Sequence, residues 1–98
     1  MKPYIVTPKA RSDLRQIGRY TSVQWGVPQR NTYLRALTER FAWIADNPML
    51  GKKRPDIHPV YMCFAEGEHL IFYIVLDQTV MIIGLPHKRM DIGRYFQA

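Results

Sequence analysis

Apolar positions repeat with a helical period in the first half of the chain and with a strand period in the second half. A short β-branched and aromatic run at 4–6 predicts a first strand. Thr7 then suits a helix N-cap, and Pro8 suits the first helical position because its missing N–H is not needed there. The predicted helix has a core stripe at three- and four-residue steps: Ala10, Leu14, Ile17 and Thr21. Gly26 is predicted to end it in a left-handed conformation.

A second helix is predicted from Pro28 to about residue 46, where the Asp-Asn-Pro sequence stops it because the residue before a proline avoids the helical region. Its core stripe also follows three- and four-residue steps: Leu34, Leu37, Phe41 and Ile44. Only two or three residues separate the two helices. So short a turn requires an antiparallel hairpin, and the apolar stripes of the pair need a further surface to cover them.

The period changes to that of strands after a basic loop at 51–56. Strands are predicted at 61–65, 69–76 and 80–85, with turns at 66–68 and 77–78. The middle strand is apolar at nearly every position, which predicts cover on both faces or a central place in the sheet. The fold class is therefore α+β: an N-terminal strand, an antiparallel helical hairpin and a three-strand antiparallel meander. We expect about four strands with a single layer of helices on the sheet.

Composition and charge limit the function without choosing it. The 98 residues of the chain form one domain, residues 1–98. The net charge of +6 attracts polyanions, either nucleic acid or an acidic protein segment, so weak and non-specific nucleic-acid binding is the default expectation. Cys63 is the single cysteine, and a fold without a disulfide suits the cytoplasm. The longest apolar stretch, 70–76, is far below the roughly 20 residues that span a bilayer, so no membrane association is expected.

A cluster of ionisable side chains follows the last predicted strand, within "LPHKRMDIGRYF" at 85–96. Such a cluster is either an acid–base site for phosphodiester cleavage or a surface that binds another protein. His58, His69 and His87 lack the spacing of metal ligands, and Cys63 has no cysteine partner. No glycine-rich phosphate loop is present either. We therefore expect neither a metal nor a cofactor.

The order of these motifs resembles the ParE branch of the RelE/ParE superfamily of toxins from bacterial toxin–antitoxin pairs. Five stretches carry the resemblance: "TPKARSDLRQIGRYT" (7–21), "WGVPQRNTYLRAL" (25–37), "NPMLGKKRPDI" (47–57), "HLIFY" (69–73) and "HKRMD" (87–91). The resemblance implies a toxin that poisons DNA gyrase and is silenced by a ParD-like antitoxin, whose C-terminal segment folds around it. The RelE branch has the same fold but is a ribosome-dependent mRNA endoribonuclease, so the fold alone does not decide between them.

One residue of the predicted strand that begins at Tyr61 argues against RNA cleavage. Aligned back from Gly67, Met62 occupies the position at which an arginine is usual in both branches. A thioether cannot neutralise phosphate charge, and losing one such cation typically costs on the order of 10²–10³ in rate. The resemblance implies a structural or binding role for His87, one that helps to set the tail, because ParE-like proteins carry this histidine without known nuclease activity. Asp91 is interpreted as its local partner, through a turn hydrogen bond or an ion pair with a neighbouring cation.

We therefore predict a protein-binding gyrase inhibitor rather than an enzyme, working as a hetero-oligomer with its antitoxin. The antitoxin is expected to bind an apolar groove between the hairpin and the sheet. Candidate antitoxin-binding residues are basic: Arg11, Arg15, Arg19, Lys53 and Arg54. Candidate target-binding residues lie in the tail: His87, Arg89, Asp91, Arg94, Tyr95 and Phe96. The alternative ribonuclease would use His87, Arg89, Lys52 and Arg54, and a third possibility is a decayed toxin that retains only antitoxin binding.

Overall fold

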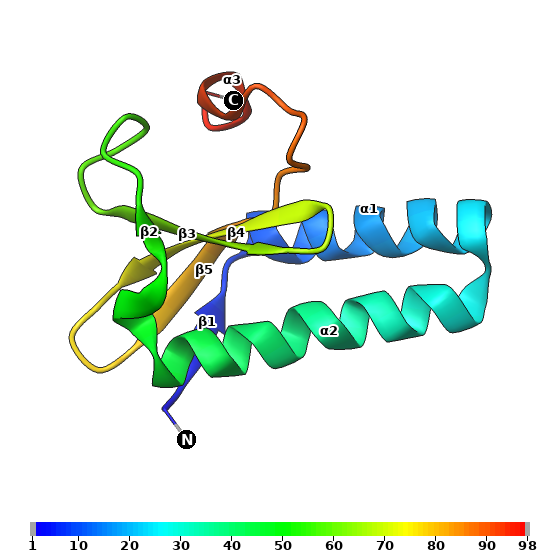
Figure 1. The fold of residues 1–98 in the computed structure, drawn as a ribbon, viewed down its shortest axis with the longest axis horizontal. Helices are drawn as coiled ribbons and strands as arrows, with labels where there is room; N and C mark the ends of the chain where they lie inside the picture. The colour runs from blue at the N-terminus through cyan, green and yellow to red at the C-terminus, as the bar shows by residue number, and fades with distance from the viewer. Residues whose placement is uncertain (1, 98) are drawn as a thin grey trace.

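The computed structural model describes residues 2–97 as one sheet with a long helical hairpin on one of its faces (Figure 1). The elements follow one another in this order: β1 (Tyr4–Val6), α1 (Pro8–Trp25), α2 (Val27–Asp46), η1 (Pro48–Leu50), β2 (Lys52–Lys53), β3 (Tyr61–Glu66), β4 (His69–Val75), β5 (Val80–Gly84) and α3 (Ile92–Tyr95). The α+β class, the first strand, the hairpin and the meander are all confirmed. In the described range 2–97, no helix is long and apolar enough to cross a membrane.

The sheet has five strands in the order β1-β5-β4-β3-β2, so β4 is central as predicted. β1 runs parallel to β5, and the other pairs are antiparallel. The expectation of about four strands was short by one, because part of the predicted basic loop forms β2. In β2, Lys52 pairs with Cys63 and Lys53 pairs with Met62. Two lysines carry no strand pattern of their own, and this edge strand forms because β3 offers it a partner.

Local signals explain the ends of the hairpin. The Thr7 hydroxyl accepts a hydrogen bond from the Ala10 N–H at 3.2 Å, which confirms the predicted N-cap. Gly26 ends α1 with φ 92° and ψ 166°. The positive φ was expected, but the ψ is extended rather than left-handed helical. This conformation reverses the chain at a single residue, so α2 begins directly at Val27.

The core lies between the hairpin and one face of the sheet. It is formed by side chains with 0% exposure from both layers: Ala10, Leu37, Phe41, Ile44, Ile71, Tyr73 and Ile82. The predicted helical stripes supply the helix side of this set. Each buried Leu, Ile or Phe contributes about 1.5–3 kcal/mol relative to an exposed one. The hairpin is therefore fixed rigidly on the sheet, and its free surfaces are available for other contacts.

The opposite face of the sheet is partly covered by the C-terminal tail. Phe96, directly after α3, lies with its ring centroid 5.0 Å from those of Tyr61 and Phe72. Ile71, Phe72 and Tyr73 of β4 are all buried, so cover on both faces is confirmed for this strand. A single layer of helices was predicted. The hairpin forms that layer, and α3 adds a short second one on the opposite face (Figure 1).

Met62 occupies the core and not the open face of the sheet. Its side chain is 6% exposed and belongs to the cluster beneath the hairpin, and its strand partner is Tyr73. The next residue, Cys63, pairs with Phe72 and therefore faces the tail. Interpreting Met62 as a missing phosphate ligand was wrong, because an arginine at this position would enter the core. The residue at position 62 carries no information on nuclease activity.

Candidate partner-binding groove

A groove of about 1040 Å³ runs along α1 on the hairpin side of the molecule. One wall is formed by α1, the opposite wall by the β3–β4 turn and the tail, and α2 contributes at its N-terminal end. Much of its lining is apolar or aromatic: Ile17, Tyr20, Trp25, Tyr33, Leu85 and Tyr95. A concave, largely apolar surface of this size suits a peptide segment or a small ligand.

Tyr33 and His69 build the inner end of the groove. The Tyr33 Oη lies 2.6 Å from His69 Nδ1 and accepts the Glu68 N–H at 3.0 Å. Burial, followed by the charge of His87, lowers the pKa of His69 to about 4, so this ring is neutral at physiological pH. Burial also raises the pKa of Tyr33. This end of the groove therefore combines two neutral polar rings.

The backbone between β3 and β4 allows Tyr33 to approach closely. Gly67 has φ 56°, a conformation that favours glycine, and a Cβ built there would lie 2.5 Å from the Tyr33 ring. A side chain at this turn would therefore push Tyr33 away from His69.

Asp13 and Tyr95 connect the two walls of the groove. The Asp13 carboxylate accepts the Leu85 N–H at 2.9 Å and the hydroxyl of Tyr95. Burial and this bond raise the pKa of Tyr95. Lys9 Nζ lies 4.2 Å from the centroid of the Tyr95 ring. These contacts tie the first helix, the end of β5 and the tail to one another.

Gly84 makes room for this contact. A Cβ built at Gly84 would lie 2.6 Å from the Tyr95 hydroxyl. Gly84 pairs with Phe72, so the missing side chain would stand on the face that α3 covers. Tyr95 therefore reaches from α3 across the end of β5 to Asp13 on α1.

The outer end of the groove is formed by aromatic residues at the tip of the hairpin, which projects beyond the sheet (Figure 1). Tyr20 is 66% exposed and Trp25 is 73% exposed. Val23 and Val27 lie beside them at the same tip and are also exposed. Lys9 and Arg89 add positive charge to the lining of the groove. Large apolar side chains exposed together in this way mark a contact surface.

The six candidate target-binding residues do not form one surface. His87, Arg89 and Tyr95 line the groove, whereas Phe96 packs on the other face of the sheet. His87 Nδ1 accepts the Arg89 N–H at 3.1 Å, and its ring lies 5.3 Å from that of His69. His87 therefore makes the expected ring hydrogen bond near the end of the strand, and its structural or binding role stays a prediction.

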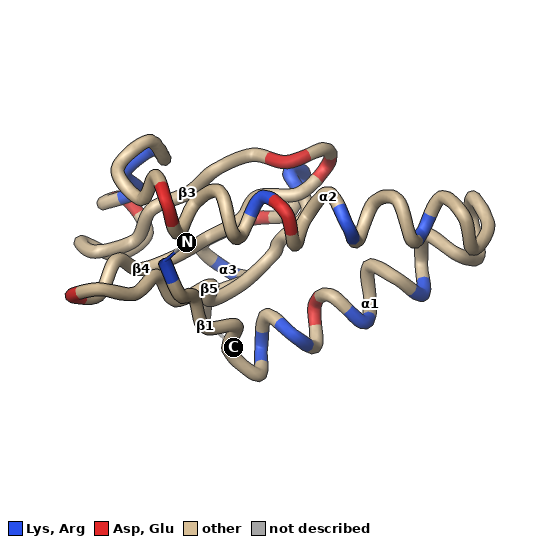
Figure 2. The backbone as a smooth tube through the Cα atoms, turned by 90° about the horizontal axis from the view of Figure 1, so that it is seen from below, with Lys and Arg blue, Asp and Glu red and all other residues tan. Residues whose placement is uncertain are grey.

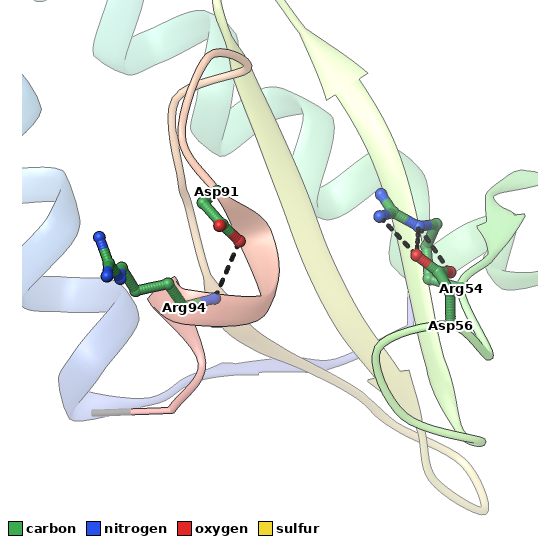
Figure 3. A network of polar contacts seen from close by, with 4 residues as sticks. All are labelled: Arg54, Asp56, Asp91 and Arg94. Carbon is green, nitrogen blue, oxygen red and sulfur yellow. Dashed lines mark hydrogen bonds and ion pairs between the residues drawn. The ribbon is translucent and has the colours of Figure 1, made fainter.

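Asp91 and Arg94 belong to α3 and not to the groove. The Asp91 carboxylate accepts the Arg94 N–H at 3.1 Å and caps the helix (Figure 3). The predicted turn hydrogen bond of Asp91 is confirmed, but its partner is the backbone of Arg94. The Arg94 side chain is exposed.

None of the five candidate antitoxin-binding residues lines the groove. Arg11, Arg15 and Arg19 are exposed on α1, and Lys53 is exposed on β2. Arg54 is half-buried and forms an ion pair with Asp56 at 3.0 Å, which lowers the pKa of that carboxyl (Figure 3).

The residues of the alternative nuclease site are divided between the two faces of the sheet. The Arg54 guanidinium lies 5.3 Å from the Phe72 ring on the tail face, and Lys52 shares that face through its pairing with Cys63. His87 instead contacts His69, which lies on the hairpin side with Tyr33. The four side chains therefore do not converge on one phosphate. Within residues 2–97, no three His, Cys, Asp or Glu side chains lie close enough to hold a metal ion.

Sequence reasoning missed three residues that shape the groove: Asp13, Tyr33 and His69. Each acts through a partner at least 36 residues away in the chain, so no local pattern identifies it. Asp13 did leave a signal, since it is the only acidic residue among the first 38. A single carboxylate on an otherwise basic helix indicates that it has a specific partner elsewhere in the fold.

The chain is similar in sequence to proteins of one family. The sequence profile described as "ParE toxin of type II toxin-antitoxin system, parDE" matches residues 4–92. Toxin ParE1 of Mycobacterium tuberculosis is 35% identical over 92 residues, covering 93% of this chain and 94% of that protein. Toxin ParE1 of Caulobacter vibrioides is 35% identical over 91 residues, with the same coverage of both chains.

A solved structure shows the same fold at lower identity. The structure described as "Chromosomal ParDE TA system from P. aeruginosa" contains a chain with a TM-score of 0.76 and 18% identity. The match covers 89% of this chain and 96% of that one. The likeness therefore extends over nearly the whole domain.

Proposed function

This chain belongs to the ParE family of toxins of type II toxin–antitoxin systems, and from that premise we propose that it arrests growth by binding other proteins. The proposed target is DNA gyrase, and the proposed neutralising partner is a ParD-like antitoxin with which it forms a hetero-oligomer. Because gyrase works on the chromosome, the proposed site of action is the cytoplasm. The groove beside α1 is the observation that carries the binding function.

The groove has the chemistry of a site for an amphipathic segment of the antitoxin. Apolar side chains of that segment would be buried against Ile17, Leu85 and the aromatic rings, as in other helix-in-groove complexes. Its acidic side chains would meet Lys9 and Arg89 in the lining of the groove. The net charge of +6 would speed the encounter.

Trp25 provides the test of this site. It is a groove residue that is 73% exposed, so Trp25→Ala is expected to leave the fold intact. Truncation of a well-packed aromatic anchor costs about 2 kcal/mol or roughly 30-fold in affinity. The matched control is Leu50→Ala, which removes an apolar side chain that is 64% exposed in η1, outside the groove.

The measurement is calorimetric titration of each variant with the C-terminal segment of the cognate antitoxin. We expect Trp25→Ala to bind about 30-fold more weakly and Leu50→Ala to bind like the parent protein. Equal affinities for all three proteins would exclude the groove as the antitoxin site.

The gyrase function is tested by DNA supercoiling with purified toxin, in the presence and absence of antitoxin. We expect supercoiling to fail with toxin alone and to recover when antitoxin is added. Gyrase activity that is unchanged at saturating toxin would exclude this target. Normal growth of cells that overproduce the toxin without antitoxin would instead support a decayed toxin.

The ribonuclease alternative receives no support from the geometry, since Lys52 and Arg54 lie on the opposite face of the sheet from His87. It predicts cleavage of mRNA in translating ribosomes and loss of toxicity in His87→Ala. Transcripts that remain intact in arrested cells would exclude it.

A further inference from the structure

The outer face of α1 carries a row of three arginines that the proposed groove does not use. Arg11, Arg15 and Arg19 are four residues apart and all exposed. A step of four residues rises about 6 Å along a helix and turns about 40° around it, so the row is about 12 Å long and winds gradually around α1. Basic positions follow α1 along its length in Figure 2. We call these three residues the arginine row.

The charge of the arginine row is not neutralised within the described part of the chain. The ion pairs among residues 2–97 are Arg40–Glu66 and Arg54–Asp56, and neither includes a member of the row. The first 38 residues contain seven cations and a single acid, Asp13. Asp13 lies on the groove side of α1, where it is bound to Leu85 and Tyr95. The outer face of the helix therefore presents positive charge alone.

The surroundings of the arginine row decide which partner it suits. Ser22 is a small polar neighbour on the helix, and Val23, four residues beyond Arg19, is exposed at the end of the row. The exposed aromatic residues of α1, Tyr20 and Trp25, line the groove instead. A protein partner gains affinity from buried apolar and aromatic anchors, and single-stranded nucleic acid gains it from stacked aromatic rings. The row offers no aromatic ring and, besides Val23 at its end, no exposed apolar anchor, and a row of guanidinium groups suits the phosphates of a duplex.

We propose that Arg11, Arg15 and Arg19 bind the phosphate backbone of duplex nucleic acid, independently of its sequence and without occupying the groove. Guanidinium groups are suited to this task because their planar donors match two phosphate oxygens at once. The proposal does not depend on gyrase or on the antitoxin. A toxin bound through its groove would still present the row to a duplex.

The salt dependence of binding measures the number of phosphates contacted. Each neutralised phosphate of B-DNA adds about 0.9 to the slope of log K against log salt concentration. Three contacts therefore contribute a slope of about 2.7, which amounts to roughly 40-fold in affinity between 50 and 200 mM salt. Removal of the row is expected to abolish this part of the salt dependence.

The experiment compares two triple variants of equal net charge by fluorescence anisotropy with a 20-base-pair DNA duplex. The first variant is R11Q/R15Q/R19Q. The control is R35Q/K53Q/K88Q, which removes three exposed cations from α2, β2 and the tail loop. Circular dichroism and urea unfolding verify that both variants are folded.

We expect the first variant to have a salt slope lower by about 2.7 and the control to bind DNA nearly as the parent protein does. Equal losses in the two variants would mean that the overall field attracts DNA, and this would overturn the proposal. A preference for single-stranded DNA over the duplex would also overturn it. The proposal would likewise be overturned if R11Q/R15Q/R19Q lost affinity for polyglutamate or the antitoxin segment but kept its affinity for DNA. A duplex RNA arm shows which duplex form binds more tightly, and tight binding of either form through the row supports the proposal.

Discussion

The contact between Asp13 and Tyr95 is expected to stabilise the whole domain, and Tyr95→Phe tests this directly. The substitution removes one hydroxyl and keeps the ring that packs 4.7 Å from Phe96. The lost hydroxyl donates to a carboxylate, and it also lies 3.2 Å from the N–H of Leu85. Because Asp13 keeps the N–H of Leu85 as a donor, the carboxylate is not left without a partner.

The size of the effect follows from these partners. A hydrogen bond to a charged group contributes about 1.5–3 kcal/mol. Asp13 and Tyr95 are both only partly buried, so the lower end of that range applies and we expect a loss of about 1.5 kcal/mol. For a domain of this length, such a loss lowers the Tm by about 8 °C.

Equilibrium unfolding in urea measures the change, and Tyr20→Phe is the matched control. Tyr20 is 66% exposed at the hairpin tip, and removal of its hydroxyl is expected to leave the free energy of unfolding unchanged within about 0.5 kcal/mol. A double-mutant cycle with Asp13→Asn isolates the pair, for which we expect a coupling energy of about 1 kcal/mol. Equal stabilities of Tyr95→Phe and Tyr20→Phe, or a coupling energy of zero, would refute this account of the groove wall.

Two further predictions concern the core and the inner end of the groove. Met62→Arg is expected to destabilise the domain by more than about 3 kcal/mol because it buries an unpaired charge beneath the hairpin; a soluble variant with the parent Tm would show that position 62 faces the solvent. The folded pKa of His69, about 4, lies below its unfolded value of 6.5, so stability should fall as the pH drops from 6.5 to 4. After allowance for solvent screening, we expect the free energy of unfolding to fall by about 1–2 kcal/mol. Urea titrations at pH 7 and pH 4.5 measure this fall, and it should be absent in His69→Gln. The same pH dependence in His69→Gln would assign it to other groups.

The elements were predictable where a periodic pattern extended over several turns or a whole strand. The two helices and the meander follow from such patterns, and Thr7 defined the start of α1. The phase of β3 was not predictable, because Tyr61, Met62, Cys63 and Phe64 are all apolar or aromatic and show no polar face. The wrong orientation of Met62 came from that ambiguity. β2 was missed because its pairing depends on β3 and not on its own two lysines.

The existence of an apolar groove was predicted, but most of the residues that shape it were not. His87 and Arg89 line the groove, but the sequence singled them out as candidate target-binding residues, because they lie in a dense cluster of ionisable side chains. Their partners were not identified, since Asp13 is separated by 72 residues from Leu85 and by 82 from Tyr95. Contacts of this kind are decided by the packing of α1 against β5, which no sequence window contains.

The bond between Asp13 and Tyr95 also fixes when the domain can be completed during its synthesis. Asp13 belongs to the first helix to leave the ribosome, and Tyr95 is made some 80 residues later. A nascent chain can assemble the hairpin and the sheet and still have an open groove wall. The groove is therefore the last part of the fold to close, and a prematurely ended chain would present a hairpin without the tail that shapes its groove.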